Sequence, residues 1–285
     1  MKWWSLLFAV VILVEVVFVL LAPLVGWGLP PNYASYGSEI DNLFHLILAL
    51  TGIVFILTEA ILIYNMYRFA RSDGRRSQYT HGHHRLEIIW TAVPAVILLF
   101  IAFAQVGAWE RVKYKSRMPP ADQVFEVSAR QFEWRVRYPS AERMDDPKLV
   151  ETFAREAQEN KKQVDDVHRV NEIHVWKGGQ VRVYLKTRDV LHSFFLPHLR
   201  IKQDAVPGKT IPVWFDTAGP EAEANFIYDP SSRTWKETKP LELACAELCG
   251  WGHYKMRGKL FIHESKEDFI RWLKHAAAEQ NATKD

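Results

Sequence analysis

One stretch decides what kind of fold this chain has to provide: Cys245-Ala246-Glu247-Leu248-Cys249-Gly250-Trp251-Gly252-His253-Tyr254-Lys255-Met256, which holds both cysteines of the chain. Two thiolates, one imidazole and one thioether form a soft ligand set, which suits copper better than magnesium, calcium or manganese. Gly250 and Gly252 allow the backbone to turn tightly around a bound group. A further strong ligand is missing locally, so a metal site here needs a residue from another part of the chain.

Two other interpretations of the cysteines remain open. Paired thiols outside the cytoplasm usually form a disulfide, and Cys245 and Cys249 could close a short disulfide loop. Zinc is the second competitor, but three local nitrogen or sulfur ligands and a methionine make a poor tetrahedral zinc set. A structural disulfide requires neither His253 nor Met256, so the pattern favours a copper site.

Three apolar stretches place the cysteines outside the cytoplasm. They cover residues 5–25, 43–67 and 88–109, and each is long enough for the about 20 residues that a bilayer core requires. The link between the last two is cytoplasmic by the positive-inside rule, because it contains Arg68, Arg71, Arg75, Arg76 and Arg85. Everything after Trp109 is therefore expected on the outer side of a bacterial inner membrane, in the periplasm.

The first apolar stretch has two interpretations. Lys2 followed by an apolar run is also how a secretory signal begins. The run is longer than a usual signal core and no Ala-x-Ala site follows it, so a retained membrane helix is favoured. We therefore expect a first hydrophobic segment with an external link at 1–42, a membrane helical hairpin at 43–110 and an exported domain at 111–285.

The exported domain is predicted to be mainly β. Short runs rich in Val, Ile, Phe, Tyr and Trp, bounded by Gly, Pro or Asp, predict strands at 124–128, 132–138, 173–176, 181–187, 211–216 and 259–263. Strands at this spacing indicate a sandwich or barrel. Residues 147–169 are highly charged and predict a helical or irregular insertion. Ser265 and Asp268 form a capping-box signal before an amphipathic helix whose apolar face holds Phe269, Trp272 and Leu273.

Composition adds one exclusion. A formal charge of +3 on 285 residues gives no indication of a nucleic-acid partner, and 24% charged residues are typical of a membrane anchor joined to a soluble domain.

His192 supplies the missing imidazole in a suitable place, just after the predicted strand at 181–187. It lies in the segment Asp189-Val190-Leu191-His192-Ser193-Phe194, which is followed by Ile201-Lys202-Gln203-Asp204-Ala205-Val206-Pro207-Gly208 and then by the cysteine loop. With Leu86-Glu87-Ile88-Ile89-Trp90-Thr91-Ala92-Val93-Pro94-Ala95 at the start of the third apolar stretch, this order resembles subunit II of haem-copper cytochrome c oxidases. The resemblance covers almost the whole chain and implies a membrane-anchored, cupredoxin-like Greek-key sandwich.

The resemblance also implies a dinuclear copper site of the kind called CuA. Cys245 and Cys249 would bridge two copper ions, His192 and His253 would each bind one ion, and Met256 and the Glu247 carbonyl would be weak ligands. In the family the side chain at the position of Glu247 also reaches a magnesium or manganese ion at the boundary with subunit I.

Further site residues follow from the same resemblance. Glu87 would mark the entrance of a proton pathway into subunit I, whereas without the resemblance it would be an interfacial carboxylate reaching water. Where many members have an aromatic run QWYW, this chain has Gln131-Phe132-Glu133-Trp134. Electron input through Phe132 is therefore in doubt, and Trp134, Trp251 or Tyr254 are the alternatives.

The implied function is the electron-accepting subunit of a proton-pumping terminal oxidase, an enzyme that takes electrons from cytochrome c or a membrane-bound cytochrome c complex and reduces oxygen to water in subunit I. Carboxylates facing a lysine-ringed donor are expected to guide docking, with Asp189, Asp204, Asp216, Glu221 and Glu223 as candidates. A quinol oxidase subunit lacks these copper ligands, and a nitrous oxide reductase needs a large additional domain. A membrane-tethered copper carrier or electron-transfer protein outside an oxidase is the alternative.

Overall fold

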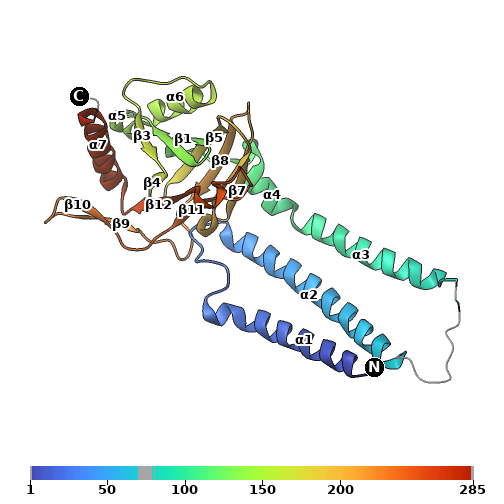
Figure 1. Ribbon diagram of the computed structural model, residues 1–285. Helices are drawn as coiled ribbons and strands as arrows, with labels where there is room; N and C mark the ends of the chain where they lie inside the picture. The colour runs from blue at the N-terminus through green and yellow to red at the C-terminus, as the bar shows by residue number, and fades with distance from the viewer. Residues whose placement is uncertain (1, 70–78, 80, 284–285) are drawn as a thin grey trace. The chain divides into compact units, whose positions relative to one another are not determined.

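The computed structural model describes residues 2–69, 79 and 81–283, and the chain divides into two compact units (Figure 1). The first unit comprises residues 1–29 and 39–108, and the second comprises residues 30–38 and 109–285. Arg71, Arg75 and Arg76, which predict a cytoplasmic link, lie outside the described residues.

The first unit consists of long apolar helices: α1 (Lys2–Leu21) with the short η1 (Ala22–Val25), α2 (Gly37–Arg68), α3 (His84–Ala104) and the start of α4 (Val106–Lys113). Within the described residues, three segments are long and apolar enough to cross a bilayer, Trp3–Val25, Gly37–Arg68 and His84–Lys113. The predicted apolar stretches are therefore all helical. Their large apolar side chains point outward, as expected of helices that are solvated by lipid or by partner helices.

The second unit contains two β-sheets. One sheet has the strand order β3-β2-β1-β5-β8, formed by Val167–Val170, Glu133–Tyr138, Gln123–Arg130, Gln180–Thr187 and Ile211–Asp216. The other has the order β10-β9-β12-β11-β6-β7, formed by Thr234–Glu237, Phe226–Asp229, Arg257–His263, Glu242–Cys245, His192–Leu196 and Ile201–Ala205, with β4 (Glu172–Trp176) paired in parallel to β12. The remaining short elements are η2 (Lys115–Arg117), α5 (Ala141–Asp145), α6 (Pro147–Gln158), η3 (Pro197–Leu199), η4 (His253–Lys255) and α7 (Lys266–Ala282).

The two sheets share one core. Trp134 of β2 is fully buried and packs edge-on against Phe194 of β6, with ring centroids 5.7 Å apart. Tyr138 of β2 donates its hydroxyl to the carbonyl of His174 on β4 at 3.2 Å. Val181, Val183 and Leu185 of β5 are buried on the same face of the sheet, because successive side chains of a strand point to opposite faces. The mainly β domain that the sequence predicts is confirmed.

The C-terminal helix is also confirmed. The Ser265 hydroxyl accepts a hydrogen bond from the Asp268 backbone N–H at 3.2 Å and so caps α7. Phe269, Trp272 and Leu273 are buried against the sheets. In Figure 1 the β9–β10 hairpin lies beside α7, and the Trp235 indole of the hairpin donates to Asp268 at 3.1 Å.

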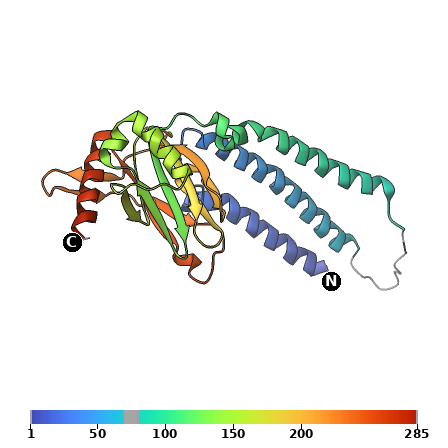
Figure 2. The same ribbon diagram turned by 90° about the horizontal axis from the view of Figure 1, so that it is seen from above.

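The charged insertion is only partly as predicted. It begins as helix α6, which with α5 covers the five-stranded sheet (Figure 2). Its end is strand β3, however, so the prediction of a helical or irregular segment throughout 147–169 was wrong there. Arg137 anchors the insertion, because its guanidinium is buried between Glu126 and Asp166, with nitrogen–oxygen distances of 2.7 and 2.5 Å.

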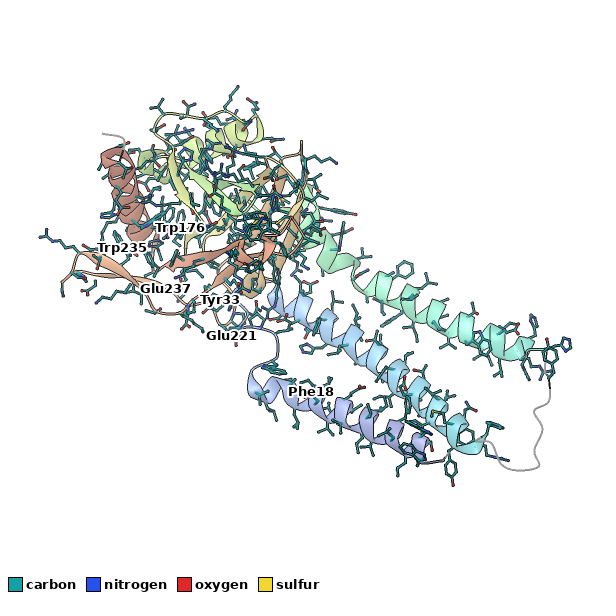
Figure 3. The ribbon with its side chains drawn as sticks, viewed as in Figure 1. Phe18, Tyr33, Trp176, Glu221, Trp235 and Glu237 are labelled. Carbon is teal, nitrogen blue, oxygen red and sulfur yellow. The ribbon has the colours of Figure 1, made fainter. Side chains whose placement is uncertain are left out.

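Residues 30–38 form a strap that packs within the second unit. Tyr33, Ala34 and Tyr36 are buried. Gly219 N–H donates to the Tyr33 carbonyl at 2.8 Å, and the backbone of Asn32 donates to the Glu221 carboxylate. Figure 3 shows Tyr33 and Glu221 close together on this side of the domain. The strap therefore belongs structurally to the β domain, although the sequence suggests only an external link.

Candidate metal centre

The sulfur and imidazole groups predicted from the sequence converge at one end of the β domain. Sγ of Cys245 lies 3.9 Å from Sγ of Cys249 and 3.9 Å from Nδ1 of His192. Sγ of Cys249 lies 3.6 Å from Nδ1 of His253 and 3.8 Å from Sδ of Met256. The ligand atoms of His192, Cys245 and Cys249 all lie within 4.8 Å of one another, so residues 53 positions apart in the chain meet in one cluster.

Neighbouring elements create this cluster. His192 is the first residue of β6, and Cys245 is the last residue of β11, which pairs with β6 through Cys245 and Phe194. The loop then returns to β12, so that the Cys245 N–H donates to the Met256 carbonyl at 3.1 Å. Gly250 has a φ of +127°, a backbone conformation that side chains rarely adopt. The glycine therefore lets the loop reverse around the sulfur atoms.

The two cysteines are free thiols. A disulfide has a sulfur–sulfur distance of about 2.05 Å, far shorter than the 3.9 Å between these sulfurs. Cys249 and Met256 are buried and Cys245 is partly buried. The arrangement therefore favours a ligand set over the disulfide alternative.

The sixth expected ligand, the backbone carbonyl of Glu247, also lies in the cluster. It accepts from the Cys245 thiol at 3.3 Å. The Glu247 side chain is exposed on the loop surface. The carbonyl of this residue therefore faces the sulfur of Cys245, whereas its carboxylate faces solvent.

Asp189 fixes the orientation of the His192 ring. Its Oδ1 accepts from Nε2 of His192 at 2.8 Å, which leaves Nδ1 facing the sulfur of Cys245. Asp189 also accepts backbone hydrogen bonds from Gln131 and Val190, both at 2.7 Å. A metal-binding histidine commonly donates its other nitrogen to a carboxylate in this way.

Gln131 supports the cysteine loop from the other side. Its side-chain amide donates to the Cys249 carbonyl at 2.6 Å. No local pattern in the sequence indicates this role, because the two residues are 118 positions apart. For Asp189 the spacing of three residues from His192 was the available signal.

The surroundings separate the pKa values of the two thiols. Burial raises the pKa of Cys245, but hydrogen bonds from His192 and from the backbone around Glu247 and Ser193 outweigh it and lower the pKa to about 6. Burial and the neighbouring charge of Cys245 together raise the pKa of Cys249 to about 11. One thiolate thus forms readily near neutral pH, whereas the second requires a nearby cation, which a bound metal ion supplies.

The donor set fits copper. Two thiols, a thioether and two imidazoles are soft or intermediate ligands, and such a mixture selects copper over the hard cations. The Asp189 carboxylate is directed at the His192 ring and two backbone N–H groups instead of the sulfurs. The residues present therefore match the chemistry of a thiolate-rich copper site.

Aromatic residues surround the cluster at different depths. Trp134 is fully buried, with its ring centroid 6.2 Å from that of His192. Phe132 packs 6.3 Å from Trp251, which is 80% exposed. In the Gln131–Trp134 run, Trp134 thus faces the core and Phe132 faces the surface of the cysteine loop.

Glu87 belongs to the other unit. It lies in the first turn of α3, where its Oε2 is 3.8 Å from Nδ1 of His84. Three of the candidate docking carboxylates hold the strap instead of forming an open acidic surface. Asp216 is buried and accepts from the Ser35 N–H at 2.8 Å, Glu221 accepts from Asn32, and Glu223 lies 3.3 Å from the Tyr33 hydroxyl.

Comparison with known proteins identifies two matched regions. Residues 24–106 match the family model of the cytochrome c oxidase subunit II transmembrane domain, and residues 123–222 match that of its periplasmic domain. Together these matches cover more than half of the chain.

Two relatives of similar length are each named as a cytochrome c oxidase subunit 2. The chain is 27% identical to an alternative cytochrome c oxidase subunit 2 of Bradyrhizobium diazoefficiens, with 94% of this chain and 90% of the relative covered. It is 26% identical to a cytochrome c oxidase subunit 2 of Thermostichus vulcanus, over 88% of this chain and 79% of the relative. A crystal structure of the periplasmic domain of cytochrome oxidase subunit II of Bradyrhizobium japonicum aligns with a TM-score of 0.38 at 22% identity, covering 57% of this chain and 98% of that domain.

The matched regions follow one another in the chain as a membrane anchor and a periplasmic β domain. The chain is accordingly a membrane-anchored component of an oxidase that contains other subunits, and its family binds copper. It belongs to the cytochrome c oxidase subunit II family.

Proposed function

We propose that this chain is the electron-accepting subunit of a proton-pumping haem-copper oxidase, and that it receives electrons at a two-copper site and passes them to haem in subunit I. The observation that carries the proposal is the convergence of six predicted ligands around the sulfurs of Cys245 and Cys249. When bound, the copper pair supplies a redox centre that takes up and releases one electron.

The chain itself supplies a rigid ligand frame. Cys245 and Cys249 would provide the thiolates, His192 and His253 would each provide Nδ1, and Met256 and the Glu247 carbonyl would be the weak ligands. His192 and Met256 are fully buried. Strand β11 lies between β6 and β12 and is hydrogen-bonded to both. Such a frame keeps the ligands in place during electron transfer, so little reorganisation is needed.

Electrons are proposed to arrive on the exposed side of the loop. Trp251 is exposed and contacts Phe132, and Trp134 packs on His192 from inside the domain. These three aromatic residues therefore line the approach to the ligands. A cytochrome c, free or in a membrane-bound complex, is the proposed donor.

The remaining roles concern the membrane part and the partner subunit. Glu87 at the start of α3 is proposed to open a proton pathway into subunit I, since a carboxylate at the end of a membrane helix is a functional candidate. The exposed Glu247 side chain is proposed to bind a magnesium or manganese ion at the boundary with subunit I. We further propose three membrane crossings, with residues 1–42 retained, a hairpin at 43–110 and the periplasmic domain at 111–285.

Copper loading of the full chain in detergent tests the central proposal. The purple colour and an electron paramagnetic resonance signal spread over two copper nuclei are expected, with about two copper ions per chain. Cys249→Ser and His192→Asn are expected to abolish this signal, whereas His275→Gln, on the exposed face of α7, should retain it. A colourless protein without free thiols would restore the disulfide interpretation, and copper that binds as a single ion would support a carrier instead.

A further inference from the structure

A second cluster of imidazole and carboxylate groups lies where β4, β12 and α7 meet. His174 of β4 is only 2% exposed, and its ring stacks on Trp272 of α7 and on Phe261 of β12, with centroid distances of 3.6 and 4.5 Å. The same histidine lines an open pocket of about 460 Å³, together with Glu172 and His275. The pocket therefore has a buried imidazole in its wall, and aromatic side chains hold that imidazole in place.

A chain of hydrogen bonds fixes which nitrogen of His174 carries the proton. Oδ2 of Asp268 lies 3.0 Å from Nδ1 of His263, and Nε2 of His263 lies 3.1 Å from Nδ1 of His174. Burial lowers the pKa of both histidines, so each ring is neutral at pH 7 and has a single N–H. The carboxylate only accepts, so His263 donates from Nδ1 and accepts at Nε2. His174 must then donate from Nδ1, which leaves a lone pair on its Nε2.

Nε2 of His174 faces a second acceptor. It lies 3.9 Å from Oε2 of Glu172, and no hydrogen-bond donor among the described residues reaches either atom. The cations close to Glu172 are paired with other carboxylates, as Arg169–Glu279 at 2.7 Å and Lys259–Glu237 at 2.6 Å. Two groups with free lone pairs thus face one another at a partly buried position, an arrangement that a cation between them would stabilise.

We propose that His174 Nε2 and the Glu172 carboxylate hold a divalent transition-metal ion of the zinc type. Zinc binds histidine nitrogen and carboxylate oxygen at about 2.0–2.2 Å, so two of its ligand atoms can lie up to about 4 Å apart. The observed separation of 3.9 Å falls within this reach. An imidazole and a carboxylate without sulfur suit zinc, whereas the cysteine loop suits copper.

The surroundings of the pair match those of a metal-binding histidine. Asp268 is a positioning residue, because it acts through His263 to direct the lone pair of His174, and metal ligands are commonly oriented in this way. His275 of α7 offers a further imidazole in the same pocket, and water can fill the remaining positions. An ion bound here would connect β4 to α7, and the site is independent of the copper function.

A zinc titration of the full chain in detergent tests the proposal, with the cysteine loop loaded with copper beforehand. Glu172→Gln should weaken the binding of one zinc ion by at least about tenfold. Glu172 is half-exposed at the start of β4, so this variant should keep the fold even if His174→Gln does not. His168→Gln, exposed on β3, is the matched control and should bind zinc as the parent does.

If the loop does not load with copper, the Cys245→Ser and Cys249→Ser double variant takes the place of the parent. The test therefore does not depend on the proposed copper site.

Two further variants examine the hydrogen-bond chain and the charge of the pocket. Asp268→Asn should weaken zinc binding by about 10- to 100-fold, since it removes the carboxylate that directs His174 through His263. Arg233 of the β9–β10 turn lines the pocket and has no carboxylate within 4.0 Å among the described residues. Arg233→Gln should therefore strengthen zinc binding, because it removes a nearby positive charge.

Urea unfolding and X-ray absorption at the zinc edge complete the test. Zinc should raise the midpoint of unfolding of the parent but not that of Glu172→Gln, and its ligands should be nitrogen and oxygen only. Equal zinc binding in the parent and in Glu172→Gln would overturn the proposal. Zinc held by the exposed His81, His83 and His84 would give that result. Sulfur ligands would place the ion at the cysteine loop and would overturn the proposal as well.

Discussion

Asp189 and His192 form a hydrogen bond of 2.8 Å that determines which imidazole nitrogen faces the cysteines. A carboxylate oxygen can only accept, so Nε2 of His192 carries the proton and Nδ1 presents its lone pair. Nδ1 is the atom that lies 3.9 Å from Sγ of Cys245. A residue that is not itself a ligand thus determines the direction of the metal-binding atom.

Asp189→Asn is expected to weaken copper binding by about 10- to 100-fold, as loss of the outer partner of a metal-binding histidine typically does. Competition with a copper chelator measures the affinity, and the spectrum should remain that of a two-copper site. Asp204→Asn, on the exposed part of β7, is the matched control and should bind copper normally. Unchanged affinity in Asp189→Asn would show that packing alone orients His192.

Gly252→Ala is expected to destabilise the cysteine loop. An added Cβ would lie 2.5 to 2.7 Å from ring atoms of Phe132, and forced overpacking costs about 1–3 kcal/mol. Copper-loaded protein should therefore unfold at lower urea concentration than the parent. The double variant with Phe132→Ala should recover part of the loss; if it does not, the clash is not with Phe132.

The sequence predicted six of the twelve strands in the described residues, and the C-terminal helix, for local reasons. The Ser265 cap and the apolar face of α7 lie within one helix, and the six predicted strands have strong β-forming composition. Strand β3 lies in a charged segment, and the other missed strands, β6, β7, β9, β10 and β11, are only four or five residues long, so none of them shows a clear apolar alternation.

The candidate site was likewise predicted only in part from the sequence. Its ligands carry recognisable chemistry, whereas Gln131 and the strap owe their roles to contacts between distant segments. Such contacts depend on the tertiary fold and leave no local pattern.

The stability of the β domain is expected to fall as the pH drops below about 6.5. Burial holds the pKa of His174 well below its ordinary value of 6.5, with His263 and Arg169 adding to the effect. Burial also lowers the pKa of His263, which Asp268 only partly offsets. Between the lowered pKa values and 6.5 the unfolded chain binds protons that the folded chain does not, so the free energy of unfolding decreases with falling pH.

Urea unfolding at about pH 7.5 and about pH 5.5 measures this loss across the histidine range. His174→Gln should show a smaller difference between the two conditions, while His275→Gln, exposed on α7, should keep it. Burial raises the pKa of the nearby Glu172 above 4.5, so the folded chain binds this proton before the unfolded chain does. At pH values just above 4.5, Glu172 therefore increases the free energy of unfolding as the pH falls. A pH-independent parent would contradict the assignment to the buried histidines.

Arg137→Met is expected to destabilise the domain by up to about 3–5 kcal/mol, because it removes the cation between two buried carboxylates. Glu126 then keeps only Lys186 at 2.8 Å, and Asp166 keeps only Arg143 at 3.3 Å. The Glu126, Arg137 and Asp166 side chains are at most 4% exposed. Replacing all three by apolar residues should cost less than the single change, because Lys186 and Arg143, which then lose these partners, are each partly exposed and can reach water. Equal losses in the single and triple variants, measured by urea unfolding, would show that the network contributes through its attraction and not through the penalty of a broken pair.

Trp134→Phe is expected to slow electron input more than Phe132→Leu, by about tenfold, or about 1.4 kcal/mol in activation free energy. Trp134 is fully buried with its ring 6.2 Å from the His192 ring, whereas Phe132 meets the loop through glycine backbone and Trp251. Removing the indole therefore loosens the packing on a ligand, while shortening Phe132 alters only the surface approach. Stopped-flow reduction at equal copper content compares the variants, and equal slowing in both would refute this order.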